Sequence, residues 1–106
     1  MLGPFEAVNN TDPNGNPTGG FAVGIGIRVD WQDGPLGREG DRQEPNGAFA
    51  ETLIAIAIQR IEFYQQSPFA CRENALAITK LEESLHWLNH RTKNREQRGV
   101  EGLHQK

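Results

Sequence analysis

The sequence predicts an α+β fold, with a small N-terminal antiparallel β region at residues 1–45 and a helical hairpin with a C-terminal tail at 46–106. Three observations predict it. Apolar residues alternate with small or polar ones from position 21 to 31, and apolar residues recur every three or four positions from 53 to 92. Most of the 12 glycines and 6 prolines precede residue 48. A chain of 106 residues suits one compact domain with a modest core.

The clearest strand lies in "GGFAVGIGIRVDWQDG", where six apolar residues occupy every second position. We expect one apolar face that must be covered and an opposite face left nearly bare by glycines. The stretch "FEAV", Phe5 to Val8, is a candidate partner strand, and the loop between the two is rich in turn-forming residues. The six alternating residues are Phe21, Val23, Ile25, Ile27, Val29 and Trp31.

The stretch "PNGAFAETLIAIAIQRIEFYQQS" predicts the first helix. Because Ile56 and Phe63 fall outside its main apolar stripe, this helix is apolar over more than one face, which predicts self-association through the helices. The stripe consists of Leu53, Ile54, Ala57, Ile58, Ile61 and Tyr64.

A second helix follows "QQSPF", with Ser67 expected to cap it, Pro68 expected in its first turn and Gly99 expected beyond its end. The short connection predicts that the two helices run antiparallel as a hairpin. Its seam steps alternately by three and four residues, as in a heptad pattern. The seam residues are Cys71, Asn74, Ile78, Leu81, Leu85, Leu88 and Thr92.

The chain has a net charge of −3, which argues against general binding of polymeric nucleic acid. Residues 86–98 nevertheless hold four cations against one acid, a compact patch that suits a small anion. Cations near a helix C-terminus are also favoured by the helix dipole alone, so both interpretations stand. The single Cys71, the absence of a long apolar run and the absence of a signal pattern predict a reducing compartment, no membrane span and no export.

Asn74 and Arg91 are the candidate polar residues of a binding site. An asparagine on an apolar seam either fixes the register of the helices or hydrogen-bonds the edge of a nucleobase. Arg91 lies about 25 Å farther along the same helix, so a small ligand reaches both only if two copies pair antiparallel. Phe63 and Tyr64 lie near the turn, where an aromatic ring could stack a base; ordinary packing of the hairpin would place them there too.

The sequence shows no convincing catalytic set. His86 and His90, with Glu82 one turn earlier, are spaced like zinc ligands, but a third strong ligand is missing and a polar helix face explains them equally well. "GIGIRV" lacks the third glycine and the following helix of a phosphate-binding loop. Ser67, Ser84 and Cys71 have no evident activating partner. We therefore expect a protein that is not an enzyme and that needs neither a metal nor a cofactor.

The stretches "CRENALAITKLEESLHWLNHRT" and "RGVEGLHQK" resemble the helical hairpin of two kinds of phage anti-defence protein. These are the first-described Thoeris anti-defence (Tad) sponges and the type-two anti-CBASS (Acb) sponges. The upstream "GFAVGIGIRVDWQDGPLGR" is similar to the N-terminal region of the Thoeris sponges, and the whole resemblance covers about residues 20–106.

The resemblance implies a sponge that binds immune signals, namely cyclic ADP-ribose isomers made by TIR enzymes, without cleaving them, in the cytoplasm of the infected bacterium. It also implies homodimers to homohexamers, and for some members cyclic di- or trinucleotides at a second site. On this basis Asn74 would hold the adenine edge or ribose, Phe63 or Tyr64 would stack the base, and Arg91 of a partner copy would neutralise the diphosphate. Arg72 could assist. The second site would comprise Arg98, Gly99, Gly102 and His104, although Leu103 stands where a threonine is expected.

Two other functions remain open at this stage. One is a small metal-dependent hydrolase of the same signals with His86 and His90 as ligands, and the other is a structural phage protein that uses the hairpin only to oligomerise. The first predicts a chemically altered ligand, and the second predicts no nucleotide binding at all.

Overall fold

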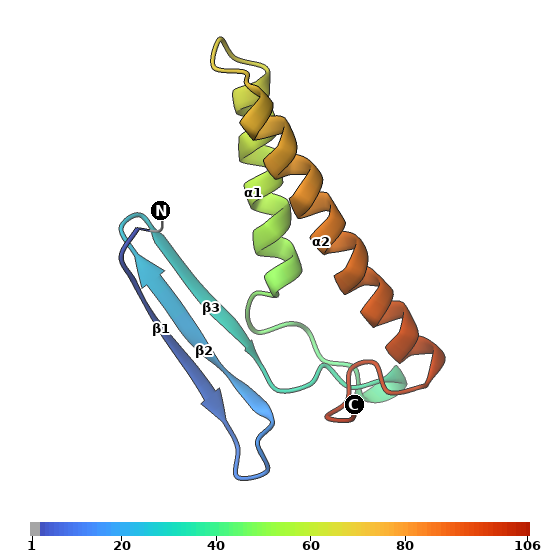
Figure 1. The fold of residues 1–106 in the computed structure, drawn as a ribbon. Coiled ribbons are helices and arrows are strands. Elements are labelled where there is room, and N and C mark those ends of the chain that lie inside the picture. Colours follow the sequence, from blue (N-terminus) through green and yellow to red (C-terminus); the bar gives the residue numbers. More distant parts are fainter. Residues whose placement is uncertain (1–2) are drawn as a thin grey trace. The chain divides into compact units, whose positions relative to one another are not determined.

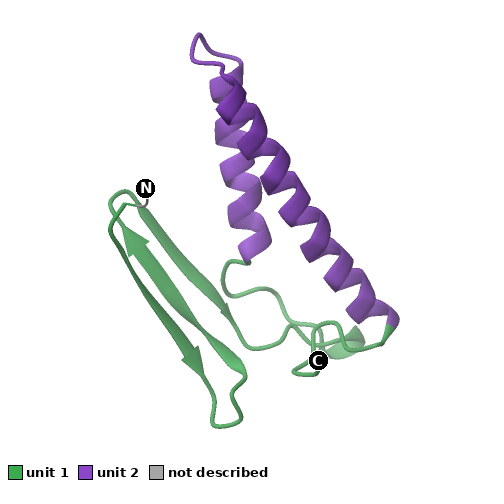
Figure 2. Ribbon diagram, viewed as in Figure 1, with its two compact units in different colours: residues 1–49, 98–106 green, residues 50–97 purple. Residues whose placement is uncertain are grey.

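A computed structural model describes residues 3–106 and confirms the predicted α+β fold. Three strands, β1 (Phe5–Thr11), β2 (Pro17–Gly24) and β3 (Ile27–Asp33), precede a short 3₁₀ turn, η1 (Glu39–Asp41), and two helices, α1 (Ala50–Gln65) and α2 (Arg72–Gln97) (Figure 1). The chain divides into two compact units (Figure 2). Residues 1–49 and 98–106 form the sheet unit, and residues 50–97 form the hairpin unit. The tail that we predicted together with the hairpin thus groups with the β region.

The sheet unit is built on an antiparallel sheet with the strand order β1-β2-β3. The predicted partner strand exists and continues beyond Val8 to Thr11. The loop that follows it is closed by Asp12, whose carboxylate accepts hydrogen bonds from the backbone N–H groups of Asn14 and Asn16, both at 2.9 Å, and from the Asn16 side chain at 3.0 Å. An aspartate that binds its own following backbone is a standard way to begin a tight turn.

The long alternating strand that we predicted is in fact a β-hairpin. Gly24 pairs with Ile27, so Ile25 and Gly26 form a two-residue turn between β2 and β3. Gly26 has a φ of 77°, a backbone conformation that glycine adopts without steric cost, and the side chain of Ile25 is 95% exposed. The prediction was wrong because the apolar Ile25 continues the alternation across the turn.

The turn also separates the apolar residues onto two faces of the sheet. Directly paired residues share a face, and Phe21 pairs with Asp30 while Ala22 pairs with Val29. Phe21 therefore lies with charged side chains: the Arg28 guanidinium is 5.0 Å from its ring centroid, and the same guanidinium donates to Asp30 at 3.0 and 3.1 Å. Val29 lies on the opposite face, so the single apolar face that we expected does not form.

The outer edge of β3 pairs with the segment that leads into the helices. The backbone N–H of Ala48 donates to the Asp30 carbonyl at 2.8 Å, and the N–H of Gln32 donates to the Ala48 carbonyl at 3.0 Å. Asn46 extends this contact, because its amide oxygen accepts from the Asp33 N–H at 2.8 Å. Residues 46–48 are thereby held in extended form, which explains why α1 begins at Ala50 and not near Pro45.

The hairpin unit consists of α1 and α2, which run antiparallel as predicted (Figure 1). Each of the seam positions from Asn74 to Thr92 is half-buried, whereas Cys71 at the start of the seam is exposed. On α1, Ile58 is buried and the other stripe residues are half-buried except Tyr64, which is 38% exposed. The period of three and four residues therefore identified the contacting faces of both helices.

The turn between the helices differs from the expected one. Ser67 does not cap α2, which begins four residues later than Pro68; its hydroxyl donates to the Tyr64 carbonyl at the end of α1. The start of α2 is held instead by Gln65, whose side-chain oxygen accepts from the Cys71 N–H at 2.9 Å and whose amide nitrogen donates to the Cys71 carbonyl at 3.0 Å. One glutamine side chain thus joins the end of α1 to the start of α2.

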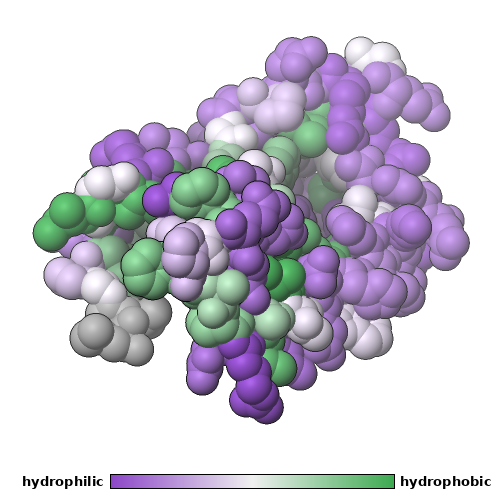
Figure 3. Space-filling model, turned by 90° about the horizontal axis from the view of Figure 1, so that it is seen from above, coloured by the Kyte–Doolittle hydropathy of each residue, from purple (hydrophilic) through white to green (hydrophobic). Residues whose placement is uncertain are grey.

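Few of the side chains that the structure describes are buried. Among the described residues the buried hydrophobic side chains are Val29 in the sheet unit and Ile58 in the hairpin unit. Large hydrophobic side chains reach the surface instead, including Ile56 at 60%, Phe69 at 79% and Trp87 at 62% exposure. Hydrophobic residues are visible on the face of the molecule that Figure 3 shows. Over the described residues, neither helix combines the length and the apolar character that crossing a membrane requires.

Candidate functional site

The tip of the hairpin carries a cluster formed by Arg60, Phe63 and Tyr64, which we call the tip cluster. All three lie on the last turns of α1, at spacings of three and four residues that bring their side chains together. The Arg60 guanidinium carbon lies 4.9 Å from each ring centroid, and its Nε donates to the Tyr64 hydroxyl at 3.0 Å. The two rings are 6.0 Å apart and tilted by 57°, and Phe63 is 50% exposed. An exposed aromatic pair beneath a cation can stack a planar ligand.

The polar candidates of α2 fall into two places. Arg72 and Asn74 lie in its first turn, near the tip cluster, because Gln65 ties Cys71 to the end of α1. Asn74 is half-buried, and Arg72 is exposed. Arg91 is exposed near the other end of α2, about 25 Å away along the helix axis. Within one chain, therefore, four of the five predicted ligand-binding residues gather at the tip, and Arg91 lies apart from them.

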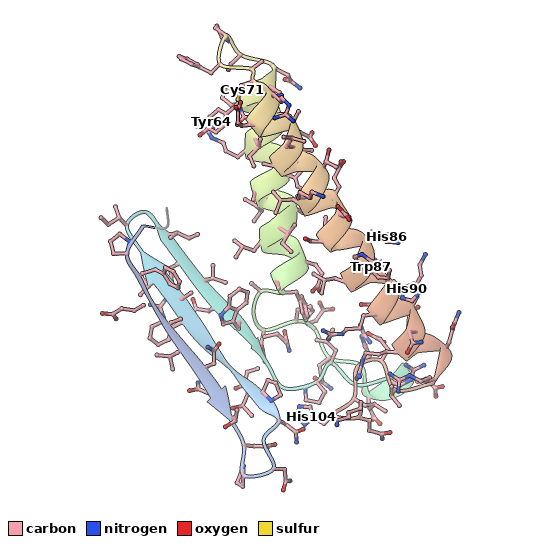
Figure 4. The ribbon with its side chains drawn as sticks, viewed as in Figure 1. Tyr64, Cys71, His86, Trp87, His90 and His104 are labelled. Atoms are coloured by element: carbon pink, nitrogen blue, oxygen red, sulfur yellow. The ribbon has the colours of Figure 1, made fainter. Side chains whose placement is uncertain are left out.

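Trp87 occupies the surface of α2 between His86 and His90 (Figure 4). The indole meets the His86 ring edge-on at 5.4 Å between centroids and the His90 ring at 5.8 Å. Each imidazole thus packs against the tryptophan ring. Among the described residues, no group of three or more His, Cys, Asp or Glu side chains is arranged to hold a metal ion.

Within the sheet unit, the C-terminal tail is attached to the loop after β3 by Arg38, Arg42 and Glu101, which we call the tail clasp. Arg42 Nη1 lies 2.8 and 2.9 Å from the two carboxylate oxygens of Glu101, and Arg38 Nη1 donates to the Glu101 backbone carbonyl at 3.0 Å. Arg38 also lies 3.8 Å from the carboxylate. Two cations therefore share one acidic side chain.

The four residues predicted for a second site all belong to the segment that carries this clasp. Gly99 and Gly102 have φ values of 76° and 79°, and the Gly102 carbonyl accepts a hydrogen bond from the Gly37 N–H at 2.8 Å. Arg98 Nη1 donates to the Lys106 carbonyl, and His104 is exposed. The positive φ of Gly99, two residues after the end of α2, matches the helix stop that we predicted.

A carboxyl group with a shifted pKa lies in the turn between β1 and β2. The hydrogen bond from the Asn16 side chain lowers the pKa of Asp12, and the backbone N–H groups of Asn16 and Asn14 lower it further. The charge of His104 adds a smaller effect in the same direction. Because each donor favours the ionised form, this carboxylate holds its turn together at neutral pH.

Sequence reasoning missed three arginines. Arg60 could have been found, because it precedes Phe63 and Tyr64 by three and four residues on a helix. Arg38 and Arg42 could not, because their partner Glu101 lies about sixty residues farther along the chain and only the fold brings them together.

The antiparallel sheet and the helical hairpin, with aromatic and cationic residues at the hairpin's tip, define a small α+β protein. Comparison with known protein families identifies the family to which it belongs. The family model described as "Acb2/Tad1, hairpin domain" matches residues 24–93, and the chain belongs to this family, as the resemblance in the sequence indicated. All five residues predicted for the first site lie inside the matched region, and the four predicted for the second site lie beyond it.

A relative from Bacillus phage SBSphiJ7, named "Thoeris anti-defense 1", is 56% identical to this chain over 78 residues. The matched part covers 74% of this chain and 52% of the relative. This chain therefore matches about half the length of that protein.

Proposed function

We propose that the protein is a phage anti-defence sponge that binds and sequesters cyclic ADP-ribose isomers inside the infected bacterium without cleaving them, which blocks activation of the Thoeris effector. The name of the phage relative supports the anti-Thoeris role. The observation that carries the ligand class is the tip cluster, where two exposed aromatic rings lie beside the Arg60 guanidinium within the family-matched region. A nucleotide with a base and a diphosphate meets both features, because a base stacks on rings and phosphates pair with arginine.

In the proposed complex, Phe63 or Tyr64 stacks the adenine and Asn74 hydrogen-bonds its edge or the ribose. The diphosphate then needs a cation at the tip. Arg72 is exposed there, and Arg91 of a second copy supplies the planar fork that matches two phosphate oxygens. Asn74 is half-buried, which is compatible with both of its predicted roles. Its amide can fix the register of the two helices and still present one edge to a ligand.

A second copy can reach the tip through the face of α2 that flanks the seam. Six residues there are spaced by four, three, four, three and four positions, and this order is the same when read in either direction. An antiparallel copy would therefore place Glu73 opposite Arg91, the small Ala77 opposite the large Trp87, and Lys80 opposite Ser84. Charge and size are complementary in the first two pairs, and five of the six residues are exposed. The six are Glu73, Ala77, Lys80, Ser84, Trp87 and Arg91.

This pairing would complete two equivalent sites for each dimer, with the partner's cation beside Glu73 and Asn74 at each tip. It would also cover Trp87, whose 62% exposure is high for the largest apolar side chain. Further association to hexamers would use other surfaces. The tail residues Arg98, Gly99, Gly102 and His104 are the proposed location for a cyclic di- or trinucleotide, and Leu103 stands there in place of the expected threonine.

The test of the function is to incubate the purified protein with each cyclic ADP-ribose isomer, remove the free ligand, denature the protein by heat and identify what is released. Intact ligand supports a sponge. A chemically modified product would instead support a hydrolase, and the absence of any released nucleotide would support a structural protein. The same assay with cyclic di- and trinucleotides tests the second site.

The test of the shared site is a charge exchange between Glu73 and Arg91. Arg91→Glu and Glu73→Arg should each weaken the dimer in analytical ultracentrifugation, and the double variant should restore it. Arg91→Glu alone should also bind the ligand at least tenfold more weakly, because a carboxylate would replace the arginine beside the phosphate. Lys93→Glu, two residues away on the same helix, is the matched control and should affect neither property. A monomeric wild-type protein with full affinity would refute the shared site.

A further inference from the structure

Arg60 occupies the position that a stacking base would need. Its guanidinium covers both rings of the tip cluster at 4.9 Å and is anchored by the hydrogen bond to the Tyr64 hydroxyl. A base that stacks on either covered ring face must take the place of this guanidinium. Displacing Arg60 from the rings is therefore part of the free energy of binding a base at this site.

From this geometry we propose, building on the function above, that Arg60 is a movable cation that closes the stacking site in the free protein and transfers to the ligand's phosphates on binding. The free rings gain a cation–π partner and stay ordered, which limits the cost of organising the site. When the base replaces the guanidinium, the side chain remains within reach of the tip because it is tethered to the same turn of α1. Its five N–H donors then suit a phosphate better than an aromatic face.

The proposal makes Arg60 a determinant of ligand class. A ligand with a base but no phosphate must displace the guanidinium and gives it no new partner. A ligand with both a base and a diphosphate displaces it and then binds it. The site should therefore discriminate against nucleosides and in favour of cyclic nucleotides that carry a diphosphate, beyond what the partner's Arg91 contributes.

Two probes separate these effects: adenosine, and the cyclic ADP-ribose isomer that wild-type protein retains most tightly. For Arg60→Ala we expect binding of the cyclic isomer to weaken about tenfold or more, because a charge-assisted contact is lost. Adenosine binding should stay equal or become tighter, because the rings are already uncovered. Arg60→Lys, which keeps the charge but loses the planar fork, should fall between wild type and alanine for the cyclic isomer.

The matched control is Arg28→Ala. Arg28 also lies over an aromatic ring, Phe21, at 5.0 Å, but belongs to the sheet unit and not to the tip. It should change neither affinity. Equal weakening of both probes in Arg60→Ala would show that the guanidinium is itself the stacking platform or only supports the fold, and unchanged binding of both would show that it takes no part. Either result overturns the proposal.

A spectroscopic readout tests the movement itself. Protons of a guanidinium above aromatic rings experience ring-current shifts, so the Arg60 Nε–H signal should lie upfield in the free protein and move downfield when the cyclic isomer is added. A signal that does not move on saturation would contradict the transfer. If wild-type protein binds no cyclic isomer, the proposed function fails; if it binds and Arg60→Ala behaves like wild type, only this inference fails.

Discussion

The two units of the molecule are stabilised by different kinds of contact. In the hairpin unit, a continuous seam of half-buried side chains between α1 and α2 supplies the contacts, with Ile58 as its most buried member. In the sheet unit, apolar residues are divided between two faces, and backbone ladders, close backbone contacts and polar links such as Asp12 and Glu101 replace a core. Substitutions should therefore act through side-chain volume in the hairpin and through backbone geometry in the sheet.

Gly20→Ala should produce the largest loss of stability, and only in the sheet unit. Gly20 lies on the central strand with a φ of 131°, and an added Cβ would overlap the Val8 backbone carbonyl of β1. Backbone strain and a clash with another strand together should cost about 3 kcal/mol or more. The measurement is denaturant unfolding followed by Trp31 fluorescence in a Trp87→Phe background, which reports the sheet unit alone.

Gly15→Ala is the matched control for that experiment. Gly15 also has a positive φ, 83°, but a Cβ there meets no atom within 4 Å. It should cost only about 1 kcal/mol, the steric cost of a left-handed residue. Equal losses of unfolding free energy for Gly15→Ala and Gly20→Ala would mean that the close approach of β1 to β2 contributes little to stability. Backbone geometry would then not be what distinguishes the sheet unit from the hairpin unit.

Ile58→Ala should have the next largest effect, in the hairpin unit. Truncating a buried isoleucine removes apolar burial and leaves a cavity, which typically costs about 2–4 kcal/mol. Ile56→Ala changes the same residue type on the same helix, but Ile56 is 60% exposed and should cost less than about 0.5 kcal/mol. Helical circular dichroism during unfolding measures both. If Ile56→Ala proved equally costly, that side chain would have to be buried by another copy.

The same contrast explains what the sequence could predict. On α2 one helical period runs without interruption, so the half-buried positions from Asn74 to Thr92 follow from spacing alone. In the sheet unit Ile25 keeps the alternation in phase through a turn that only Gly26 signals, so one strand was predicted where two exist. Within one strand, every second residue lies on the same face. Across the two-residue turn, an odd-numbered residue of β2 pairs with an even-numbered residue of β3, so the apolar odd-numbered residues of the two strands lie on opposite faces.

In the candidate site, too, the features set by local sequence could be predicted, and those set by contacts between distant residues could not. The position of Phe63 and Tyr64 beside the start of α2 follows from a short helical connection and could be predicted. The role of Gln65 as the link to Cys71 could not, because a serine and a proline supplied stronger local capping signals than a glutamine at the end of the preceding helix. Contacts of the tail, such as Arg42 with Glu101, depend on long-range folding and have no local signature.

Glu101→Gln should have a moderate effect on the sheet unit. The carboxylate binds Arg42 through both oxygens and lies near Arg38, but the Arg42 side chain is 43% exposed, so solvent screens the attraction. A loss of about 1 kcal/mol is expected, and added salt should reduce the difference from wild type. Glu96→Gln, on the exposed surface of α2, is the control. A loss that is insensitive to salt would indicate that hydrogen-bond geometry, and not charge, holds the tail.

The smallest effect should come from acid, through Asp12. Hydrogen bonds lower the pKa of this carboxyl below its ordinary value of about 3.9, so its stabilising contribution is complete above that ordinary value and is lost as pH falls through the lowered pKa. Asn16→Ala removes the largest cause, so the pKa of Asp12 should rise toward the ordinary value in a carboxyl NMR titration. Asn10→Ala, on β1, leaves all three hydrogen bonds to Asp12 in place and should not move the pKa. An Asp12 that titrates identically in Asn16→Ala and wild type would mean that the loop is not organised by this carboxylate, and the sheet unit would then depend on its backbone contacts alone.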